Sequence, residues 1–304
     1  MESLIPLRHL SVFVTVARGA SLSEAAASLY MSKSSVSQTL SELEHRLGVS
    51  VFERRRGRLV LNEAGRRLLP MADELLGRAR AVSKMFSPNV GGILRLGVTE
   101  SVAAHRLMPI ASAFHRRFGW FPQIHVGNTD ECLVMLSNYE LDLAMVEGIV
   151  TLPDMEVVHW REERMIAVAA PTHSCASRKP LTWEALRKVD WLLREPGSGS
   201  RVFFESHLRA KLGDDLSVLV LNRHDLVLRA AAAGFGVALV SEGVLDDPHF
   251  ADALVKFDLP ETFTRRLSIV VRSGKFETEE MRAWRQLAFE STAADASSAS
   301  DSLQ

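Results

Sequence analysis

Residues 21–65 carry the pattern that most constrains how this chain of 304 residues can fold. Two helical patterns meet at a short turn around Met31 and Ser32, and four arginines follow them within positions 54–58. This order predicts a helix-turn-helix with a basic wing, an arrangement that places one helix in the major groove of DNA. No comparable nucleic-acid signal occurs in the rest of the sequence, which we expect to form a small-molecule sensor.

Local signals mark the first two helices of this region. Apolar residues recur at helical spacing over residues 7–18, and Gly19 is a residue type that commonly ends a helix. Ser21 stands three positions before Glu24, which is the spacing of a capping box at a helix N-terminus. We therefore predict one helix over 7–18 and a second helix that opens after Ser21.

A third helix is predicted to begin after its N-cap Ser32 and to end at Gly48. Its buried stripe is expected at Val36, Leu40, Leu43 and Leu47. Recognition helices present their N-terminal residues to DNA bases, and short or flexible polar side chains suit that contact. The candidate DNA contacts of this helix are Ser32, Lys33, Ser34, Ser37 and Gln38. Taken alone, such a face would usually be a solvated helix surface, but its position after a capped, alanine-rich helix favours DNA recognition.

Residues 49–61 are predicted to form a two-stranded wing with a strongly basic tip. Arg54, Arg55, Arg56 and Arg58 repel one another unless an anion approaches, and the phosphates of DNA are such anions. We predict that Arg54, Arg55 and Arg58 contact phosphate, and nothing in the pattern strongly separates Arg56 from them.

The run SEAAASLYMSKSSVSQTLSELEHRLGVSVFERRRGRLVLNEAG resembles the N-terminal signature of the LysR-type transcriptional regulators. The shared features are the Ala-Ala pair, the serine of the turn, the pair Leu43–Glu44, the Leu-Gly pair, the Phe-Glu-Arg and the closing Glu-Ala-Gly. Three positions depart from the family pattern: Lys33–Ser34 stands in place of Gln-Pro, Gln38 in place of a common Arg, and Asn62 in place of Thr. The family contacts DNA through this helix and wing, so the resemblance implies the same role here with a different operator sequence.

Asn62 is expected to cap a long helix over residues 63–86. Apolar residues recur there at spacings of four and three, which is a heptad seam that favours packing against a like helix. The seam consists of Leu68, Ala72, Leu75, Ala79, Val82 and Phe86. A homodimer through 63–86 is the natural inference, because the alternative, packing on the chain's own domain, fits a helix of this length poorly. Pro70 lies off the seam and is expected to kink the helix or remove one hydrogen bond.

After a hinge at about 87–92, short strand patterns alternate with helical patterns in the order βαβαβ, which predicts a largely parallel sheet. The predicted strands span 93–98, 123–127, 141–146, 164–170, 190–194, 217–221, 237–240 and 267–271. The alternation resembles the effector domain of the same family, which is similar to a periplasmic binding protein with two α/β subdomains.

This resemblance implies a division of the chain into a winged helix-turn-helix (1–62), a linker and dimerisation helix with its hinge (63–90) and an effector-binding domain (91–290). Subdomain one would hold 91–164 and 268–290, and subdomain two would hold 165–267. The polar tail 291–304 is low in large apolar residues and is expected to be disordered.

Ligands of parallel sheets bind beyond the carboxyl ends of the strands, where helices begin. Four loops satisfy this rule, and the last of them, REPGSGSR, combines backbone donors, hydroxyls and an arginine that suit an anion. The candidate effector-binding residues are Thr99, Ser101, Thr129, Glu147, Ser198, Ser200 and Arg201. Any single one of these residues could equally be a helix cap without a ligand, and the convergence of several loops favours a site. For His224 and Asp225, a surface or capping role is favoured over a position that faces the cleft.

Charge and cysteine content bound the function further. Residues 1–86 carry 13 Lys and Arg against 8 Asp and Glu, whereas the remainder is net acidic, as expected of a nucleic-acid module joined to a different domain. Cys132 and Cys175 show no metal-binding spacing and are expected to be small buried apolar residues, so no metal or cofactor is predicted. No secretory signal and no apolar run of membrane-spanning length is found, which favours a cytoplasmic protein without a membrane partner.

The sequence suggests three candidate functions. A DNA-binding transcriptional regulator controlled by a small polar or anionic effector explains both halves of the sequence. An enzyme is disfavoured because no activated nucleophile, metal motif or useful acid pair occurs, and a solute-binding protein is disfavoured by the N-terminal region. The expected partners are double-stranded promoter or operator DNA and a small-molecule effector. The family resemblance alone implies a homotetramer, and RNA polymerase would be a further partner of an activator.

Overall fold

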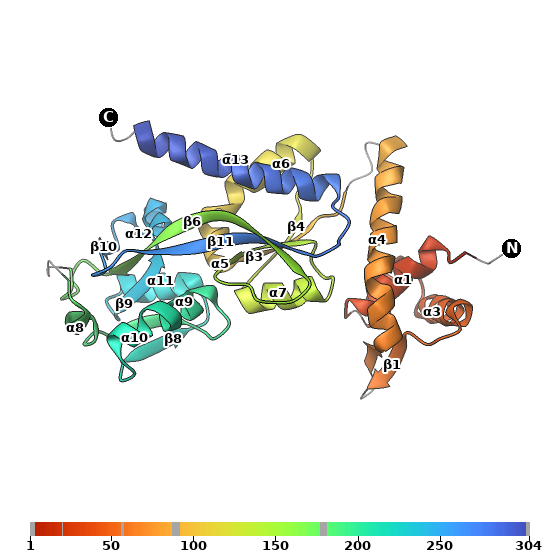
Figure 1. Cartoon of the computed structure of the whole chain (residues 1–304), viewed down its shortest axis with the longest axis horizontal. Coiled ribbons are helices and arrows are strands. Elements are labelled where there is room, and N and C mark those ends of the chain that lie inside the picture. Colours follow the sequence, from red (N-terminus) through yellow and green to blue (C-terminus); the bar gives the residue numbers. More distant parts are fainter. Residues whose placement is uncertain (1–3, 20, 56–57, 87–91, 177–180, 302–304) are drawn as a thin grey trace. The chain divides into compact units, whose positions relative to one another are not determined.

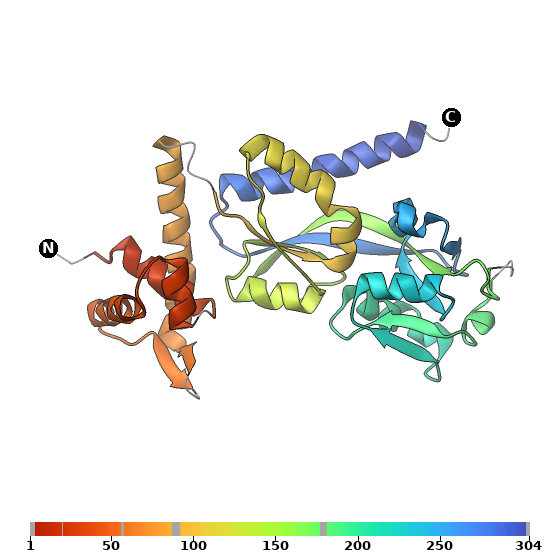
Figure 2. The same cartoon turned by 180° about the vertical axis from the view of Figure 1, so that it is seen from behind.

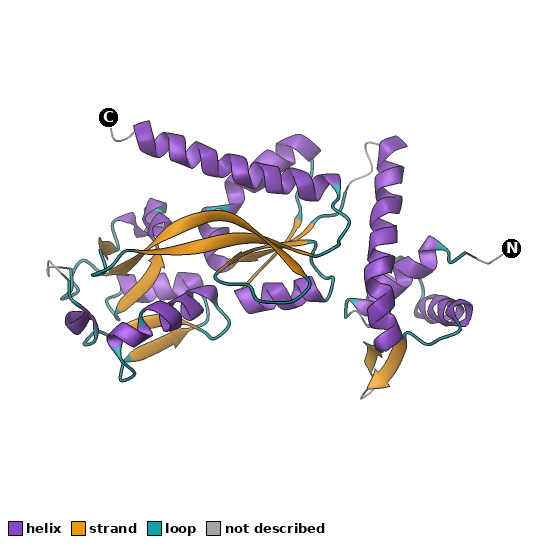
Figure 3. Ribbon diagram, viewed as in Figure 1, coloured by secondary structure: helices purple, strands orange, loops and turns teal. Residues whose placement is uncertain are grey.

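The computed structural model describes residues 4–19, 21–55, 58–86, 92–176 and 181–301, and its secondary structure is shown in Figures 1, 2 and 3. The chain forms two compact units. The N-terminal unit holds residues 1–92 with the short segments 138–140 and 274–280, and the C-terminal unit holds the rest.

The N-terminal unit has four helices and a two-stranded hairpin among its described residues. These elements are α1 (Leu7–Ala17), α2 (Leu22–Ser28), α3 (Lys33–Leu47), β1 (Phe52–Arg55), β2 (Arg58–Leu61) and α4 (Glu63–Phe86). The predicted stripe of α3 is confirmed, since Val36, Leu40 and Leu43 are buried and Leu47 is partly buried in the core of this unit.

The predicted helix caps are confirmed. The Ser21 hydroxyl accepts a hydrogen bond from the Glu24 amide at 3.2 Å, and the Glu24 carboxylate accepts one from the Ser21 amide at 2.7 Å. Ser32 caps α3 by accepting from the Ser35 amide at 3.1 Å. Gly48 ends α3 in the left-handed conformation with φ of 68°, which glycine adopts without steric cost.

The helix α4 differs from its predicted role in one respect. Leu69 and Ala72 are buried, and Leu68 and Leu76 partly buried, in the core of the N-terminal unit, so the first part of the predicted seam packs on the chain's own domain. The second part does not, because large apolar side chains along it are exposed. These are Leu75 (49%), Val82 (56%) and Phe86 (80%), and Met71 (63%), which lies outside the predicted seam, is exposed as well. Pro70 is accommodated inside a continuous helix.

The C-terminal unit is built on one nine-stranded sheet within the described residues, with strands in the order β4-β3-β5-β11-β6-β9-β7-β8 and β10 beside β6. The strands are β3 (Arg95–Thr99), β4 (Gln123–Gly127), β5 (Leu143–Glu147), β6 (Met155–Ala169), β7 (Trp191–Arg194), β8 (Val218–Leu221), β9 (Val237–Ser241), β10 (Val255–Phe257) and β11 (Phe263–Arg272). We call the part around β3, β4 and β5 the first half and the part around β7, β8 and β9 the second half.

Each half is parallel, as predicted, but the strands that join the halves are not. β3 pairs in parallel with β4 and β5, and β7 pairs in parallel with β8 and β9. The long strands β6 and β11 run antiparallel to each other and cross from one half to the other (Figure 1). The prediction missed these extensions because it began β6 at residue 164 and β11 at residue 267, where the continuous apolar runs start.

Helices cover both faces of each half. In the first half, apolar side chains of α6 (Leu107–Phe118) and α13 (Glu279–Asp301) share a buried cluster on one face, and those of α7 (Thr129–Ser137) share another on the opposite face. Figure 2 shows the same layering from behind. In the second half, α8 (Trp183–Leu186), α9 (Gly199–His207) and α10 (Arg209–Leu212) lie on one face and α11 (His224–Ala232) on the other. The remaining helices are α5 (Glu100–His105), η1 (Glu242–Asp246) and α12 (Pro248–Ala251).

The polar tail is corrected by the structure. Residues 291–304 were expected to be disordered, yet α13 continues as far as Asp301, and residues 302–304 lie outside the described residues. Four alanines among residues 293–299 account for the continuation, because alanine has the highest intrinsic helix propensity.

We expect Gly65→Ala to destabilise the packing of the wing on α4. A Cβ atom at residue 65 would lie 2.1 Å from the Val51 carbonyl oxygen and 2.7 Å from a Leu61 methyl carbon. Overpacking of this kind costs about 1–3 kcal/mol, which outweighs the gain in helix propensity of about 1 kcal/mol. Thermal unfolding should show a lower midpoint for the variant. Gly77→Ala in the same helix, where the nearest atom would lie at 3.3 Å, is the matched control, and equal midpoints for the two variants would contradict the explanation.

Candidate functional site

The N-terminal unit presents the exposed face of α3 as its candidate DNA-binding surface. The cap residue Ser32 also shares hydrogen bonds with the hydroxyls of Ser34 at 2.9 Å and Ser35 at 2.8 Å. Five candidate residues are exposed on this face: Ser32, Lys33, Ser34, Ser37 and Gln38. Their hydroxyl, amide and ammonium groups are available for base edges and phosphates.

Gln38 is preorganised by a neighbour that the sequence reasoning did not use. Its Nε2 atom donates a hydrogen bond to Glu42 Oε1 at 3.0 Å, one helical turn further along the exposed face. Glu42 also lies 3.4 Å from the imidazole of His9 on α1. The side-chain carbonyl of Gln38 therefore points away from the Glu42 carboxylate.

Two polar side chains hold the wing against the helices. Glu44 accepts hydrogen bonds from the backbone amides of Val51 at 2.8 Å and Phe52 at 3.4 Å. Asn62 donates to the Ser50 carbonyl at 2.7 Å and caps α4 by accepting from the Gly65 amide at 2.9 Å. The family-like residues Leu43–Glu44 and the closing glycine thus position the wing, a role that their presence in a sequence signature did not reveal.

The wing arginines differ in their surroundings. Arg54 and Arg55 are exposed on β1, and the Arg55 guanidinium forms an ion pair with Glu53 at 2.8 Å. Arg58 begins β2 opposite Arg55 in the hairpin register. The side chain of Arg58 and the whole of Arg56 lie outside the described residues. The exposed guanidinium groups suit contact with DNA phosphates.

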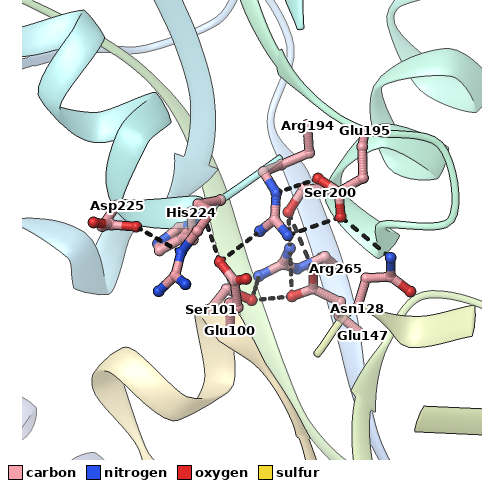
Figure 4. Close-up of polar contacts among 11 residues, drawn as sticks. Glu100, Ser101, Asn128, Glu147, Arg194, Glu195, Ser200, His224, Asp225 and Arg265 are labelled. Atoms are coloured by element: carbon pink, nitrogen blue, oxygen red, sulfur yellow. Dashed lines mark hydrogen bonds and ion pairs between the residues drawn. The ribbon is translucent and has the colours of Figure 1, made fainter. Parts of the chain in front are cut away.

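The C-terminal unit contains a second candidate site at the junction of its two halves (Figure 4). We call it the Arg265 cluster, and its members are Ser101, Glu147, Glu163, Ser200 and Arg265. Ser101 lies on α5 and Glu147 at the end of β5 in the first half, Ser200 lies on α9 in the second half, and Glu163 and Arg265 face each other on the crossing strands β6 and β11.

Arg265 is the centre of this cluster, with only 1% of its side chain exposed. Its guanidinium lies 2.8 Å from a Glu147 carboxylate oxygen and 3.2 Å from a Glu163 oxygen. It also donates to the Ser200 hydroxyl at 2.9 Å and to the Ser101 hydroxyl at 3.5 Å. The Arg106 guanidinium lies 3.3 Å from Glu163, so two guanidinium groups balance two buried carboxylates.

The Glu147 carboxylate is held like a bound anion. One oxygen accepts hydrogen bonds from Ser101 and Arg265, and the other accepts one from the Ser200 hydroxyl at 3.2 Å. Gly199, at the start of α9, packs so closely that a Cβ atom there would lie 2.7 Å from the Glu147 carbonyl oxygen. The first residues of α9 therefore meet the end of β5 directly.

A second carboxylate of the first half, that of Glu100, also contacts groups of the second half. Glu100, on α5 in the first half, accepts a hydrogen bond from the His224 amide at 2.6 Å, at the start of α11 in the second half. Its carboxylate also lies 3.5 Å from the Arg194 guanidinium. Nearby, the Asn128 amide donates to Glu195 at 3.2 Å. Polar contacts from the first half thus meet the ends of the strands of the second half (Figure 4).

The structure brings most of the predicted effector-binding residues together. Ser101, Glu147 and Ser200 belong to the Arg265 cluster, and the Thr129 hydroxyl donates to the Glu147 carbonyl at 3.2 Å. Thr99 and Ser198 are buried as N-caps of α5 and α9 that make no side-chain capping bond. Arg201 does not join the Arg265 cluster: its guanidinium pairs with Glu205 on its own helix at 2.7 Å and donates to the Arg194 carbonyl at 3.5 Å.

Sequence reasoning missed the charged residues that organise this site. Arg265 and Glu163 lie in the parts of β11 and β6 that the apolar runs did not cover. Their positions could have been found by alternation, because Phe263, Arg265 and Leu267 share one strand face while Arg266 is exposed. His224, for which a surface or capping role was favoured, has only 6% of its surface exposed.

Burial and charge shift the protonation of several groups here. Burial opposes ionisation of Glu163, but Arg265 and Arg106 outweigh it and lower the pKa of that carboxyl. Burial, reinforced by His105, Arg194 and Arg265, lowers the pKa of His224 to about 3. His224 is therefore neutral at pH 7, and its Nε2 atom has no hydrogen-bond partner among the described residues.

A cavity of about 350 Å³ is lined in part by Glu147. Its other polar side chains are Thr129, Asp130 and Thr151, and its apolar lining includes Leu133, Val134, Ile149, Leu152 and Val202. A volume of this size accommodates a small metabolite, and Glu147 is the member of the Arg265 cluster that lines it.

Among the described residues, no group of three or more His, Cys, Asp and Glu side chains is arranged to hold a metal ion. Cys132 and Cys175 are buried free thiols, and burial raises the pKa of Cys132 to about 12. Within the same residues, no helix has the length and apolar character needed to cross a lipid bilayer.

Comparison with known proteins matches both units. Residues 7–66 match the model of bacterial regulatory helix-turn-helix proteins of the lysR family, and residues 89–293 match that of the LysR substrate binding domain. The chain is 31% identical over 257 residues to the uncharacterized HTH-type transcriptional regulator YeiE of Escherichia coli, which covers 84% of this chain and 87% of the relative.

Solved structures show the same fold. Full-length OxyR from Pseudomonas aeruginosa superposes with a TM-score of 0.74 at 17% identity and covers 94% of this chain and 95% of its own. Full-length LysG from Corynebacterium glutamicum with bound effector arginine gives a TM-score of 0.65 at 18% identity and covers 94% of this chain and 98% of its own.

The lowered pKa of His224 predicts a loss of stability in mild acid. The unfolded chain protonates this residue near pH 6.5 and the folded chain only near pH 3, so the unfolded state binds more protons between these values. The free energy of unfolding should fall by about 1.4 kcal/mol per pH unit below pH 6.5 on account of this residue. Thermal unfolding between pH 7 and 5 should show a shallower fall for His224→Gln than for the wild-type chain.

The control for this measurement is His45→Gln, which makes the same substitution at an exposed position and should give a slope closer to wild type than His224→Gln does. His105, whose pKa is also lowered by burial, should maintain part of the slope in the His224 variant. Parallel pH profiles for the wild-type and His224→Gln proteins would contradict the assignment.

Proposed function

Because this chain belongs to the LysR family of transcriptional regulators, we propose that it contacts operator DNA through the exposed face of α3 and the wing arginines. The chain is a DNA-binding regulator with a C-terminal effector-binding domain rather than an enzyme. The observation that supports these contacts most directly is the exposed row of candidate side chains on α3, opposite the buried residues Val36, Leu40 and Leu43.

The proposal divides the DNA contacts into two kinds. Ser32, Lys33, Ser34, Ser37 and Gln38 lie at the N-terminal end of the recognition helix, where side chains reach base edges. Arg54, Arg55 and Arg58 lie on the wing, where guanidinium groups neutralise phosphates whatever the sequence. Lys33, Ser34 and Gln38 depart from the family pattern and would set the preferred operator.

The effector is proposed to be a small polar or anionic molecule that binds between the two halves of the C-terminal unit. We propose that these halves are subdomain one (91–164 and 268–290) and subdomain two (165–267), on either side of the crossing strands. The bound effector arginine of LysG gives a precedent for a small ligand in a protein of the same fold. An effector changes activity only by binding one arrangement of the halves more tightly than another.

The protein is proposed to act as a homodimer through α4 and as a homotetramer in its complete form. Met71, Leu75, Val82 and Phe86 are exposed with spacings of four, seven and four, which places them on one helix face. Such a stripe is typical of a helix that packs against a second copy. RNA polymerase would be a further partner if the protein activates transcription.

We expect Arg54→Ala to weaken binding to every DNA fragment, whereas Gln38→Ala should change which fragment is preferred. Loss of one phosphate contact should reduce the slope of log affinity against log salt by about 0.9. Gel-shift titrations on the DNA upstream of the chain's own gene and on scrambled fragments measure both effects. Arg229→Ala, at an exposed position of the C-terminal unit, controls for net charge. Equal losses on all fragments for the Gln38 variant would refute the division of contacts, and no binding by the wild-type chain at low salt would refute the function.

We expect Val82→Asp and Phe86→Asp to dissociate the dimer, because each places a charge in the apolar stripe of α4. Light scattering during size-exclusion chromatography should show a smaller particle for the variants, with affinity for DNA lowered as the second half-site is lost. Arg80→Asp, on the opposite side of the same helix, is the matched control and should leave the mass unchanged. A variant that keeps the wild-type mass at micromolar concentration would remove the stripe from the interface.

A further inference from the structure

Two of the predicted effector-binding groups, the hydroxyls of Ser101 and Ser200, are engaged by a side chain of the protein itself. The Ser101 hydroxyl, the Ser200 hydroxyl and the Arg265 guanidinium all donate to the carboxylate of Glu147. One guanidinium and two hydroxyls converging on one carboxylate are the contacts that a free oxyanion would make. An anion that uses these donors must therefore compete with Glu147.

The balance of buried charges disfavours binding of an anionic ligand while the Glu147 carboxylate stays in place. The buried guanidinium of Arg265 and the partly buried guanidinium of Arg106 are matched by the two buried carboxylates of Glu147 and Glu163. An anionic ligand beside Glu147 would place three carboxylate-like charges against two guanidiniums in a site where unpaired charge is costly. Either the ligand stays out or Glu147 leaves.

Glu147 lies at a direct contact between the two halves, so displacement of its side chain would change that contact. It ends β5 in the first half, whereas Ser200 and Gly199 begin α9 in the second half, and a Cβ atom on Gly199 would overlap Glu147. The next residue, Gly148, has a φ of 92°, which is a conformation that L side chains rarely adopt. Movement of the Glu147 side chain would therefore release a direct contact between the two halves beside the 350 Å³ cavity.

We propose that Glu147 is a built-in competitor of the effector, which is a small oxyanion (a carboxylate, phosphate or sulfate group) that takes its place on Arg265, Ser101 and Ser200. The inference rests on the proposed role of this cluster in effector binding and specifies its ligand and its regulation. In the effector-free protein, Glu147 ties the halves together as an intramolecular anion. The effector breaks this tie by supplying the anion itself, which favours a different arrangement of the halves.

The side chain of Glu100 occupies a second position that suits an anion. Its carboxylate accepts the first backbone amide of α11 and lies beside Arg194, both in the second half. Helix N-termini favour negative charge, so this is also a position that suits an anion. An effector with two anionic groups would displace both carboxylates, and succinate serves as a probe of that case.

The test measures anion binding to the full chain by isothermal titration calorimetry, at constant ionic strength, with sulfate, inorganic phosphate and succinate as probes. Glu147→Gln removes the competing charge and should bind at least one probe about tenfold or more tightly than the wild-type chain, because the competent fraction of the site rises. Glu147→Asp, which keeps the charge but shortens its reach, should also bind more tightly. Glu156→Gln, at an exposed position of β6, makes the same charge change and should leave all affinities unaltered.

A gain of less than about tenfold with all three probes in the Glu147→Gln protein overturns the proposal, as does an equal gain in Glu156→Gln. If circular dichroism shows that Glu147→Gln is unfolded, the Asp variant decides, and an affinity no higher than wild type then overturns the proposal. Gel shifts on the same proteins keep the two hypotheses apart. Loss of DNA binding by the wild-type chain would count against the proposed function, whereas intact DNA binding with unchanged anion affinity counts against displacement alone.

Discussion

The buried guanidinium of Arg265 is the interaction on which the C-terminal unit depends. A charge with 1% exposure is tolerated only when opposite charges and hydrogen-bond partners surround it. Glu163 supplies one partner from the neighbouring crossing strand, and Glu147 supplies the other from the first half. Ser200 on the second half accepts a further hydrogen bond from Arg265. The partners that stabilise the Arg265 charge therefore come from both halves, so the arrangement of the halves and the neutralisation of Arg265 depend on each other.

In the N-terminal unit, the main structural requirement is to hold the polar face of α3 in a fixed position. Val36, Leu40 and Leu43 anchor α3 from behind, while Glu44 and Asn62 fasten the wing through backbone hydrogen bonds. The side chains proposed to contact DNA lie on the exposed face and, apart from the cap residue Ser32, are not needed to hold α3 in place. This separation explains how positions 33, 34 and 38 can depart from the family pattern while the fold is kept.

Local features of this chain could be predicted from sequence, because a few adjacent residues determine them. The caps at Ser21 and Ser32 and the stop at Gly48 each depend on residues within four positions. The meeting of Arg265 with Glu147 and Glu163 could not be predicted, because it depends on the pairing of strands about a hundred residues apart. The seam of α4 failed in part for the same reason: periodicity shows that Ala72 is buried but not against which partner.

Both candidate sites contain guanidinium groups that suit anions, but the two sites differ in how deeply these groups are buried. Arg54 and Arg55 of the wing are exposed, so water and salt ions screen their charges. Arg265 is sealed from water, and a buried guanidinium without a counter-charge would be unstable, so the fold provides Glu147 in the place that a ligand would occupy. In the proposed mechanism, the carboxylate of Glu147 occupies the buried anion site until an effector anion replaces it. This exchange would couple ligand binding to the contact between the two halves.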